Sequence, residues 1–483
     1  MIKLIGNEFK KIFKKKTIYI LLAITLAYVI LTNIMTKATS SNRYYYYYDD
    51  TKYYEKQLAE LNPNSEADKS TYIELKSSLE LSKLTAKYGP DSWQANVINT
   101  ILPSCIDTVV RHEYSDEITE DAYQKAKAQY DEAMQKLASN DWKYFVNKDL
   151  EEINNSLNDA YAQKENTTDK QAIASIDTTI YDLELKKQID EWRLEKNISY
   201  APGFLNNALE NYYNGKIALQ DYTNKNISEL SSDELNQYNS LLEETNLSKY
   251  YINNNITLES DNRSILLNLF SNYELFILII GIVIAGSIVS EEFNRGTIKL
   301  LLVKPYNRIK ILLSKFIVCM LILVLSIVFI AGCQLIFGGI INGFDNLSTP
   351  AIFYNFDTNR VETMNLFAYI ALIGICKLPI YILLSTLAFA CSTLFASTAI
   401  AVAIPFLGYI ASSLINQFAL AYNIKQIIYF VTPNWDLSYY LFGGSPLFKG
   451  LTMPFSIAIC AIYLVIMLVV SCIVFKKRDI KNI

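Results

Sequence analysis

This sequence contains almost no histidine, and it lacks paired cysteines and nucleotide-binding motifs. His112 is the only histidine, and none of the seven cysteines belongs to a CxxC pair. Zinc sites and histidine-based catalysis depend on these residues, so we expect no metal site and no catalytic residue. The sequence also contains no GxxxxGK[ST] run, the loop that holds ATP phosphates in many ATPases. We therefore expect a chain that is not an enzyme and binds no cofactor itself.

Long apolar runs are absent from residues 37–268 but fill much of residues 17–35 and 273–475. A helix needs about 20 apolar residues to cross a hydrocarbon core of about 30 Å. The sequence therefore predicts an all-α fold, with a six-helix transmembrane domain and one large, mostly helical insertion. The predicted spans are residues 17–36, 272–290, 311–338, 366–390, 394–415 and 453–475. The first run is longer than a usual signal-peptide core, so we expect it to remain as a true span.

Charge is divided between the same two parts of the chain. Residues 37–268 carry 24 Lys and Arg against 39 Asp and Glu, whereas the rest of the chain has a net charge of +11. The basic residues gather before the first span, between the second and third spans, and after the sixth span. The positive-inside rule places these three segments in the cytoplasm. Both termini are then cytoplasmic, and residues 37–268 form an extracellular domain of a bacterial cell-membrane protein.

The first 16 residues have a helical pattern of their own. Ile5, Phe9 and Ile12 recur at helical spacing, with lysines between them. This pattern predicts an amphipathic helix that lies in the inner membrane interface and is attracted to anionic lipid. The alternative is a plain positive anchor for the first span.

The insertion is rich in helix-forming residues, as in "TEDAYQKAKAQYDEAMQKLAS" at 119–139. Ser231 with Glu234, Thr168 with Gln171, and Ser65 with Asp68 each resemble the capping box that begins a helix. The five tyrosines at 44–48 suit a membrane interface, and an aromatic wall for a ligand is the alternative. The acidic excess would attract a cationic peptide, whereas a solvated surface is the simpler interpretation.

The link between the second and third spans is unusually rich in charge. Glu291 and Glu292 end the apolar run, and Gly296 precedes the short amphipathic segment 297–303, which Pro305 ends. A short helix of this kind has no evident use inside the membrane. It indicates a contact offered to a cytoplasmic partner.

At these residues the chain resembles the type-2 permeases of ATP-binding-cassette (ABC) exporters. The resemblance covers residues 1–36 and 270–483, and it rests on "EEFNRGTIKLLLVKPYNRIKILLSKF". It implies that residues 291–315 form a coupling loop that docks on a separate ABC ATPase, where ATP and magnesium would bind. The resemblance carries the ATPase-coupling role to Glu291, Glu292, Arg295, Gly296, Thr297, Leu300, Leu301, Pro305 and Arg308, with Lys315 leading into the next span. It also implies a second permease as partner, in a homodimer or heterodimer. We expect no nucleic-acid partner.

Two polar residues within the spans are candidates for a translocation path. Lys377 lies near the middle of the fourth predicted span, and Gln334 lies in the third. A charge at the centre of a bilayer costs about 2.5–3.5 kcal/mol, so such residues usually face a cavity or a partner. The alternative for Lys377 is a shallower helix whose lysine reaches the interface.

Function therefore has two interpretations of different classes. The first is the permease subunit of an ATP-driven exporter, with a peptide or antimicrobial peptide as the candidate substrate. The second is a membrane sensor or immunity protein whose acidic extracellular domain binds cationic peptides without an ATPase. A third, the four-span ABC family that moves an outer domain, fits less well because five spans follow the insertion instead of three. The charged link at 291–315 favours the first, since a simple sensor does not need it.

Overall fold

The computed structural model describes residues 1–41, 50–258, 261–297 and 307–478. The chain divides into two compact units. The membrane unit contains residues 1–40, 225–240 and 259–483, and the insertion unit contains residues 41–224 and 241–258. Residues 225–240 and 261–268, which fall within the predicted insertion at 37–268, pack with the membrane unit.

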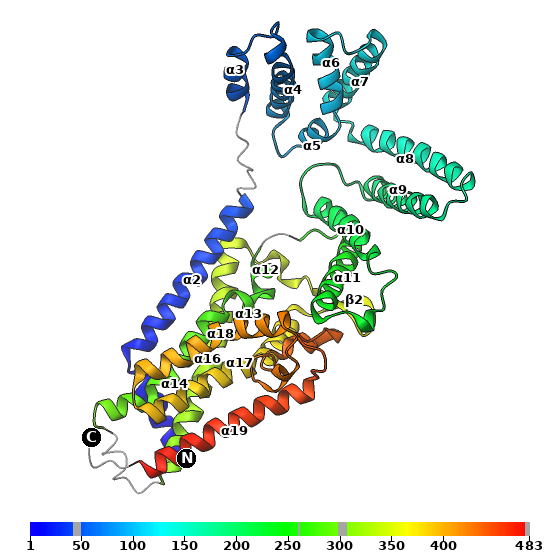
Figure 1. Ribbon diagram of the computed structural model, residues 1–483. Coiled ribbons are helices and arrows are strands. Elements are labelled where there is room, and N and C mark those ends of the chain that lie inside the picture. The colour runs from blue at the N-terminus through cyan, green and yellow to red at the C-terminus, as the bar shows by residue number, and fades with distance from the viewer. Residues whose placement is uncertain (42–49, 259–260, 298–306, 479–483) are drawn as a thin grey trace. The chain divides into compact units, whose positions relative to one another are not determined.

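Among the described residues of the membrane unit, six helices are long and apolar enough to cross a bilayer. They are α2 (Lys16–Ser41), α14 (Glu274–Asn294), α16 (Arg308–Asn342), α17 (Leu366–Phe395), α18 (Thr398–Ala421) and α19 (Met453–Lys477) (Figure 1). Each overlaps one predicted span, and most extend a few residues beyond it. The division between α17 and α18 falls at Ala396, whose left-handed backbone ends the first of these helices.

Helix α14 lies at the centre of the membrane unit, where it packs against α16, α17 and α18. Its most apolar stretch is 67% buried, whereas that of α19 is 11% buried. Gly281 and Gly286 allow this close packing, because a Cβ atom at Gly281 would lie 2.5 Å from the Ser385 hydroxyl. The exposed apolar faces of α2, α18 and α19 are the faces available to lipid.

Shorter elements complete the membrane unit. An amphipathic helix, α1 (Ile2–Phe13), precedes the spans as predicted, and its apolar face packs against α16. Its other short helical elements include α12 (Asn262–Leu267), α13 (Leu269–Asn272) and the 3₁₀ turns η1 (Ile227–Glu229), η2 (Asp345–Ser348), η3 (Lys425–Tyr429) and η4 (Leu437–Gly443).

A β-hairpin interrupts the predicted all-α fold. Strands β1 (Ala351–Asn355) and β2 (Arg360–Met364) pair antiparallel, with Phe353 opposite Glu362. The β-branched and aromatic residues of this short stretch favour strand, and Asn359 takes the left-handed conformation that closes the turn. Phe353 stacks on Phe442 of η4, with ring centroids 3.9 Å apart.

The insertion unit is helical, as predicted. Its helices are α3 (Thr51–Ala59), α4 (Glu66–Tyr88), α5 (Trp93–Thr100), α6 (Pro103–Tyr114), α7 (Glu120–Ala138), α8 (Trp142–Glu165), α9 (Lys170–Lys196), α10 (Phe204–Gln220) and much of α11 (Ser232–Asn253). Helices α8 and α9 pack along their lengths as a helical hairpin around Leu157 and Ile180 (Figure 1). The tyrosines at 44–48 lie outside the described residues.

Two of the three predicted helix starts, Ser231 and Ser65, are confirmed, and one of these two forms the predicted capping box. Ser231 and Glu234 form the reciprocal capping box, with the Glu234 carboxylate accepting from the Ser231 N–H at 2.9 Å. Helix α9 instead begins at Asp169, whose carboxylate accepts from the Gln171 N–H, so the Thr168 assignment is wrong by one residue. Ser65 does precede α4, but its side chain makes no capping hydrogen bond.

Candidate functional site

Lys315 is a fully buried cation held between two carboxylates of distant sequence origin. Its Nζ lies 2.7 Å from Glu8 of α1 and 2.8 Å from Glu292 of α14. Lys11 lies 3.0 Å from Glu8 and 3.1 Å from Glu292, so the four side chains alternate in sign around a closed ring. We call Glu8, Lys11, Glu292 and Lys315 the ion ring. Its two positive and two negative charges compensate one another, which a buried charge requires.

The charges of the ion ring reinforce one another. Burial by itself raises the pKa of Glu8, but attraction and hydrogen bonds from Lys315 and Lys11 outweigh it and lower that pKa. Burial likewise lowers the pKa of Lys11, and the charges of Glu292 and Glu8 overcome it and raise that pKa. Both groups therefore remain ionised around neutral pH.

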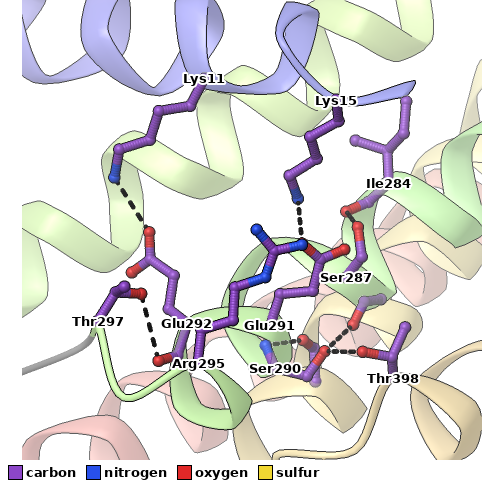
Figure 2. Close-up of polar contacts among 12 residues, drawn as sticks. Lys11, Lys15, Ile284, Ser287, Ser290, Glu291, Glu292, Arg295, Thr297 and Thr398 are labelled. Carbon is purple, nitrogen blue, oxygen red and sulfur yellow. Dashed lines mark hydrogen bonds and ion pairs between the residues drawn. The ribbon is translucent and has the colours of Figure 1, made fainter. Parts of the chain in front are cut away.

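A second set of contacts lies beside the ion ring. Figure 2 shows the side chains of Lys11 and Lys15 pointing toward Glu292 and Glu291 at the end of α14. The Lys15 Nζ is 3.0 Å from Glu291, and Arg295 is 3.6 Å from the same carboxylate. The segment between α1 and α2 is thereby attached to the last turn of α14.

Helix α14 ends at the ion ring because of its glycine. Gly296 has φ of +69°, the left-handed conformation that commonly follows a helix end, and its N–H donates to the Phe293 carbonyl at 3.0 Å. Thr297 then donates to the Glu292 carbonyl at 3.4 Å (Figure 2). Gly296 therefore terminates α14, and residues 298–303 of the amphipathic segment that it was expected to precede lie outside the described residues.

The far end of the same link is also fixed. Arg308, in the first turn of α16, donates to the carbonyls of Lys476 and Arg478 at 3.2 and 3.3 Å. Arg478 in turn donates to the Thr393 carbonyl at 2.7 Å. Leu300, Leu301 and Pro305 lie outside the described residues. The segment 298–306 is therefore connected at both ends to residues that tie α1, α14, α16, α17 and α19 together.

Lys377 belongs to a separate ionic group. Its Nζ lies 2.5 Å from Asp436 and 3.4 Å from Glu274, the first residue of α14. Tyr409 of α18 donates to the same Glu274 carboxylate at 3.0 Å. Two carboxylates thus accompany one lysine, and Asp436 connects the turn η4 to α17.

Gln334 is fully buried in a network of amides. Its side-chain carbonyl accepts from Asn33 of α2 at 2.8 Å and from the Tyr273 hydroxyl at 2.5 Å. Its NH₂ group donates back to Asn33 at 3.1 Å. The hydrogen bonds of Gln334 therefore link α2, α16 and the start of α14.

The ion ring and the Gln334 network mark two polar layers across the membrane unit. Lys315 and Gln334 are 19 residues apart on α16, or about 28 Å at a rise of 1.5 Å per residue. Glu274 and Glu292 are 18 residues apart on α14, or about 27 Å. Both separations match a hydrocarbon core of about 30 Å. Lys377 lies in the layer of Glu274, so the geometry favours the shallower of the two positions considered for it.

The sequence indicated some of these residues and not others. Glu291, Glu292, Arg295, Gly296, Thr297 and Arg308 do gather at one end of the membrane unit. The parts played by Glu8 and by the anions of Lys377 were not predicted. The only signal for Glu8 was its position as the sole acid among the basic residues 1–16. Within the described ranges, no three His, Cys, Asp or Glu side chains come together in a way that could hold a metal ion.

Comparisons with known proteins concern mainly the membrane unit. Residues 238–481, about half of the chain, match the family described as "Protein of unknown function (DUF2705)". The chain is 33% identical over 214 residues to "Uncharacterized protein YhcI" of Bacillus subtilis (strain 168), covering 44% of this chain and 67% of that protein. It is 31% identical over 203 residues to "Uncharacterized membrane protein YdbK" of the same organism, covering 41% of this chain and 76% of that protein. No solved structure matches the chain.

Proposed function

We propose that this chain, which belongs to the DUF2705 family and is a multi-pass membrane protein, is the permease subunit of an ATP-driven ABC exporter. The observation that carries this proposal is the ion ring at the base of the 291–315 link. A link that only joined two spans would need no buried cation between two carboxylates. The ring instead supports a segment that has to receive and transmit force.

We place the ion ring, both termini and the 291–315 link in the cytoplasm, with the insertion outside the cell. The basic residues beside the ring support this orientation, since short basic segments stay on the cytoplasmic side. Helix α1 then lies in the inner interface, with its exposed lysines facing anionic lipid headgroups. The Lys377 group and the Gln334 network lie at the outer end of the spans.

Force transmission follows from the contacts of the ring. A separate ATPase pair would bind the segment 298–306 and move it as ATP is bound and hydrolysed. Lys315 connects the end of α14 to the start of α16, and Glu8 adds α1 to the same group. A push on the segment would therefore move the inner ends of α14 and α16 together. Lys377, beside the outer turn η4, is the candidate contact for substrate or for the outer gate.

Binding of the ATPase tests the proposal directly. The full chain is purified from native membranes in mild detergent, with and without Leu300→Asp plus Leu301→Asp, and the recovered ATPase activity is measured. We expect the wild-type chain to recover an ATPase and the double variant to lose it while still inserting. The matched control changes two exposed apolar residues away from the link, Ile101→Asp in the insertion unit plus Ile227→Asp in η1, and should leave the recovery unchanged.

Recovery of no ATPase with the wild-type chain would overturn the exporter proposal. The chain would then be better described as a stand-alone membrane sensor or immunity protein. Equal recovery with the wild-type chain and the double variant would remove the coupling role from residues 300 and 301.

A further inference from the structure

Helix α1 carries side chains of three kinds, and each kind lies on its own face. Successive residues of an α-helix are about 100° apart, so positions separated by four or seven residues share a face. Leu4, Glu8 and Ile12 form the first face, which is buried within the membrane unit. The face that packs on α16 therefore carries the acid that pairs with Lys315 in the ion ring.

The second face of α1 is apolar and partly open. Ile2, Phe9 and Phe13 share it, since they are seven and four positions apart. Ile2 is 85% exposed, and the half-buried rings of Phe9 and Phe13 have centroids 4.8 Å apart. An apolar strip of this kind suits the acyl chains that lie just below lipid headgroups.

The third face of α1 is basic, and each of its residues directly follows a residue of the apolar face. It consists of Lys3, Lys10 and Lys14. All three lysines are exposed, and none forms an ion pair with an acid among the described residues. Lys11 and Lys15, by contrast, pair with the two acids at the end of α14. The fold uses those two lysines, whereas the basic face remains available for a partner.

The position of the ion ring indicates which partner fits these two faces. The ring forms one of the two polar layers, whose separation matches a hydrocarbon core. Because Glu8 belongs to the ring, α1 lies at the boundary of that core. A basic face directly beside an apolar face is the pattern that binds an anionic lipid surface, with headgroups at the lysines and acyl chains at the apolar residues. A soluble anion would use the lysines and leave the apolar face uncovered.

We propose that an anionic lipid surface holds α1 against α16, and that lipid charge thereby controls whether Glu8 closes the ion ring. Attachment of α1 places Glu8 2.7 Å from the Lys315 Nζ. Detachment would remove one of the two anions of Lys315 and open a side chain that is fully buried in the structure. This inference rests on the proposed function for its consequence, because the ring supports the link that would receive the ATPase. Its test uses no ATPase, so it can fail without failure of the exporter proposal.

The methylation rate of Lys315 tests the proposal. The full chain is placed in nanodiscs of phosphatidylcholine, with or without about 30% phosphatidylglycerol of the same acyl chains, and treated with formaldehyde and a borane reductant. Both reagents are uncharged, and Lys310, which is exposed on the same helix, corrects for the lower pH at an anionic surface. Each lysine near such a surface favours attachment about fivefold, so three lysines set a limit of about a hundredfold. We expect the ratio of the Lys315 rate to the Lys310 rate to be at least tenfold lower in the anionic nanodiscs.

A triple variant assigns the effect to the basic face of α1. Lys3→Gln, Lys10→Gln and Lys14→Gln together should raise the ratio in anionic nanodiscs to its value in phosphatidylcholine. The matched control makes the same change in net charge at three exposed lysines of the insertion unit and should keep the lipid effect. Its substitutions are Lys52→Gln, Lys56→Gln and Lys125→Gln. Hydrogen exchange of the α1 amides, measured in the same samples, reports whether the helix itself attaches.

Three results would overturn the proposal. Equal ratios in the two kinds of nanodisc would show that lipid charge does not reach Lys315. Slower exchange of the α1 amides without a change at Lys315 would show that lipid binds the helix but does not control the ring. Soluble glycerol phosphate carries the headgroup charge without acyl chains, so equal protection by this anion in phosphatidylcholine nanodiscs would remove the role of the apolar face.

Discussion

Lys315 is a buried ammonium group whose two nearest anions come from α1 and from α14. Replacing it with an apolar residue leaves Glu8 and Glu292 in a desolvated site with only Lys11 between them. The cost of breaking a buried ion pair in this way is about 3–5 kcal/mol. The consequence is that one side chain contributes strongly to the stability of the end of the membrane unit where α1, α14 and α16 meet.

Lys315→Met tests this at the level of the residue. We expect the variant to lose about 3–5 kcal/mol of stability, seen as a clearly lower midpoint of thermal unfolding in detergent. Lys310→Met is the control, because Lys310 is exposed on the same helix and should change the midpoint little. Equal midpoints for the two variants would show that the ion ring is not a stabilising element.

Asp190 gives the insertion unit a pH-dependent stability of defined sign. Its pKa is about 7 in the folded chain against an ordinary value of 3.8, so the folded form holds the proton more tightly. The stabilisation is fully present below about pH 4 and is lost as pH rises toward 7. Hydrogen exchange of the α8 and α9 amides, corrected for the intrinsic rate, should therefore show weaker protection at pH 8 than at pH 5. Asp190→Asn should remove that difference, and an unchanged profile in the variant would contradict the assignment to this residue.

Individual residues of the site could be predicted only where the sequence immediately around them formed an unusual pattern. Glu291 and Glu292 stood out because acids directly follow an apolar run. Glu8 did not, because its partner Lys315 is 307 positions away and nothing local specifies that pairing. The same reason hid the anions of Lys377, which come from α14 and from the turn η4. Hydrophobic spacing gives the face of a helix that is buried, but not the partner that it meets.

Elements were predicted well where one physical requirement dominates. The length of an apolar run is set by bilayer thickness, so all six spanning helices overlap their predicted ranges. The hairpin at 351–364 was missed because it is short and its strands stabilise one another only after pairing. Its packing against η4 fixes it in place. The Phe356 N–H donates to the Phe442 carbonyl at 2.8 Å, and Phe442 itself has a left-handed backbone.

Gly443→Ala tests the junction between the hairpin and η4. Gly443 has φ of +73°, and a Cβ atom there would lie 2.6 Å from the Asp357 backbone nitrogen. We expect the substitution to cost about 1–3 kcal/mol and to make the 351–364 segment more sensitive to limited proteolysis. Gly408→Ala is the matched control, since Gly408 is helical with nothing within 4 Å of an added Cβ, and it should leave cleavage unchanged. Equal cleavage in both variants would mean that the junction tolerates the side chain.

At the scale of the whole molecule, Cys105 reports the side of the membrane on which the insertion lies. It is the single cysteine of the insertion, and the other six lie in α16, α17 and α19. A membrane-impermeant maleimide added to intact cells should label the wild-type chain and not Cys105→Ser. In that background, Lys310→Cys should be labelled only after the cells are permeabilised. Labelling of the two sites in the opposite order would reverse the proposed orientation.

The spacing of the two polar layers also defines which bilayers suit this protein. The distance of about 28 Å between Lys315 and Gln334 nearly equals the thickness of a hydrocarbon core of about 30 Å, so the protein fits a narrow range of bilayer thickness. Because both layers are joined across several helices, a single helix cannot tilt to correct hydrophobic mismatch without breaking them. A bilayer with longer acyl chains must instead thin around the protein, at a cost of fractions of a kcal/mol for each ångström. Acyl-chain length then becomes a variable that selects the membrane regions in which the chain is most stable.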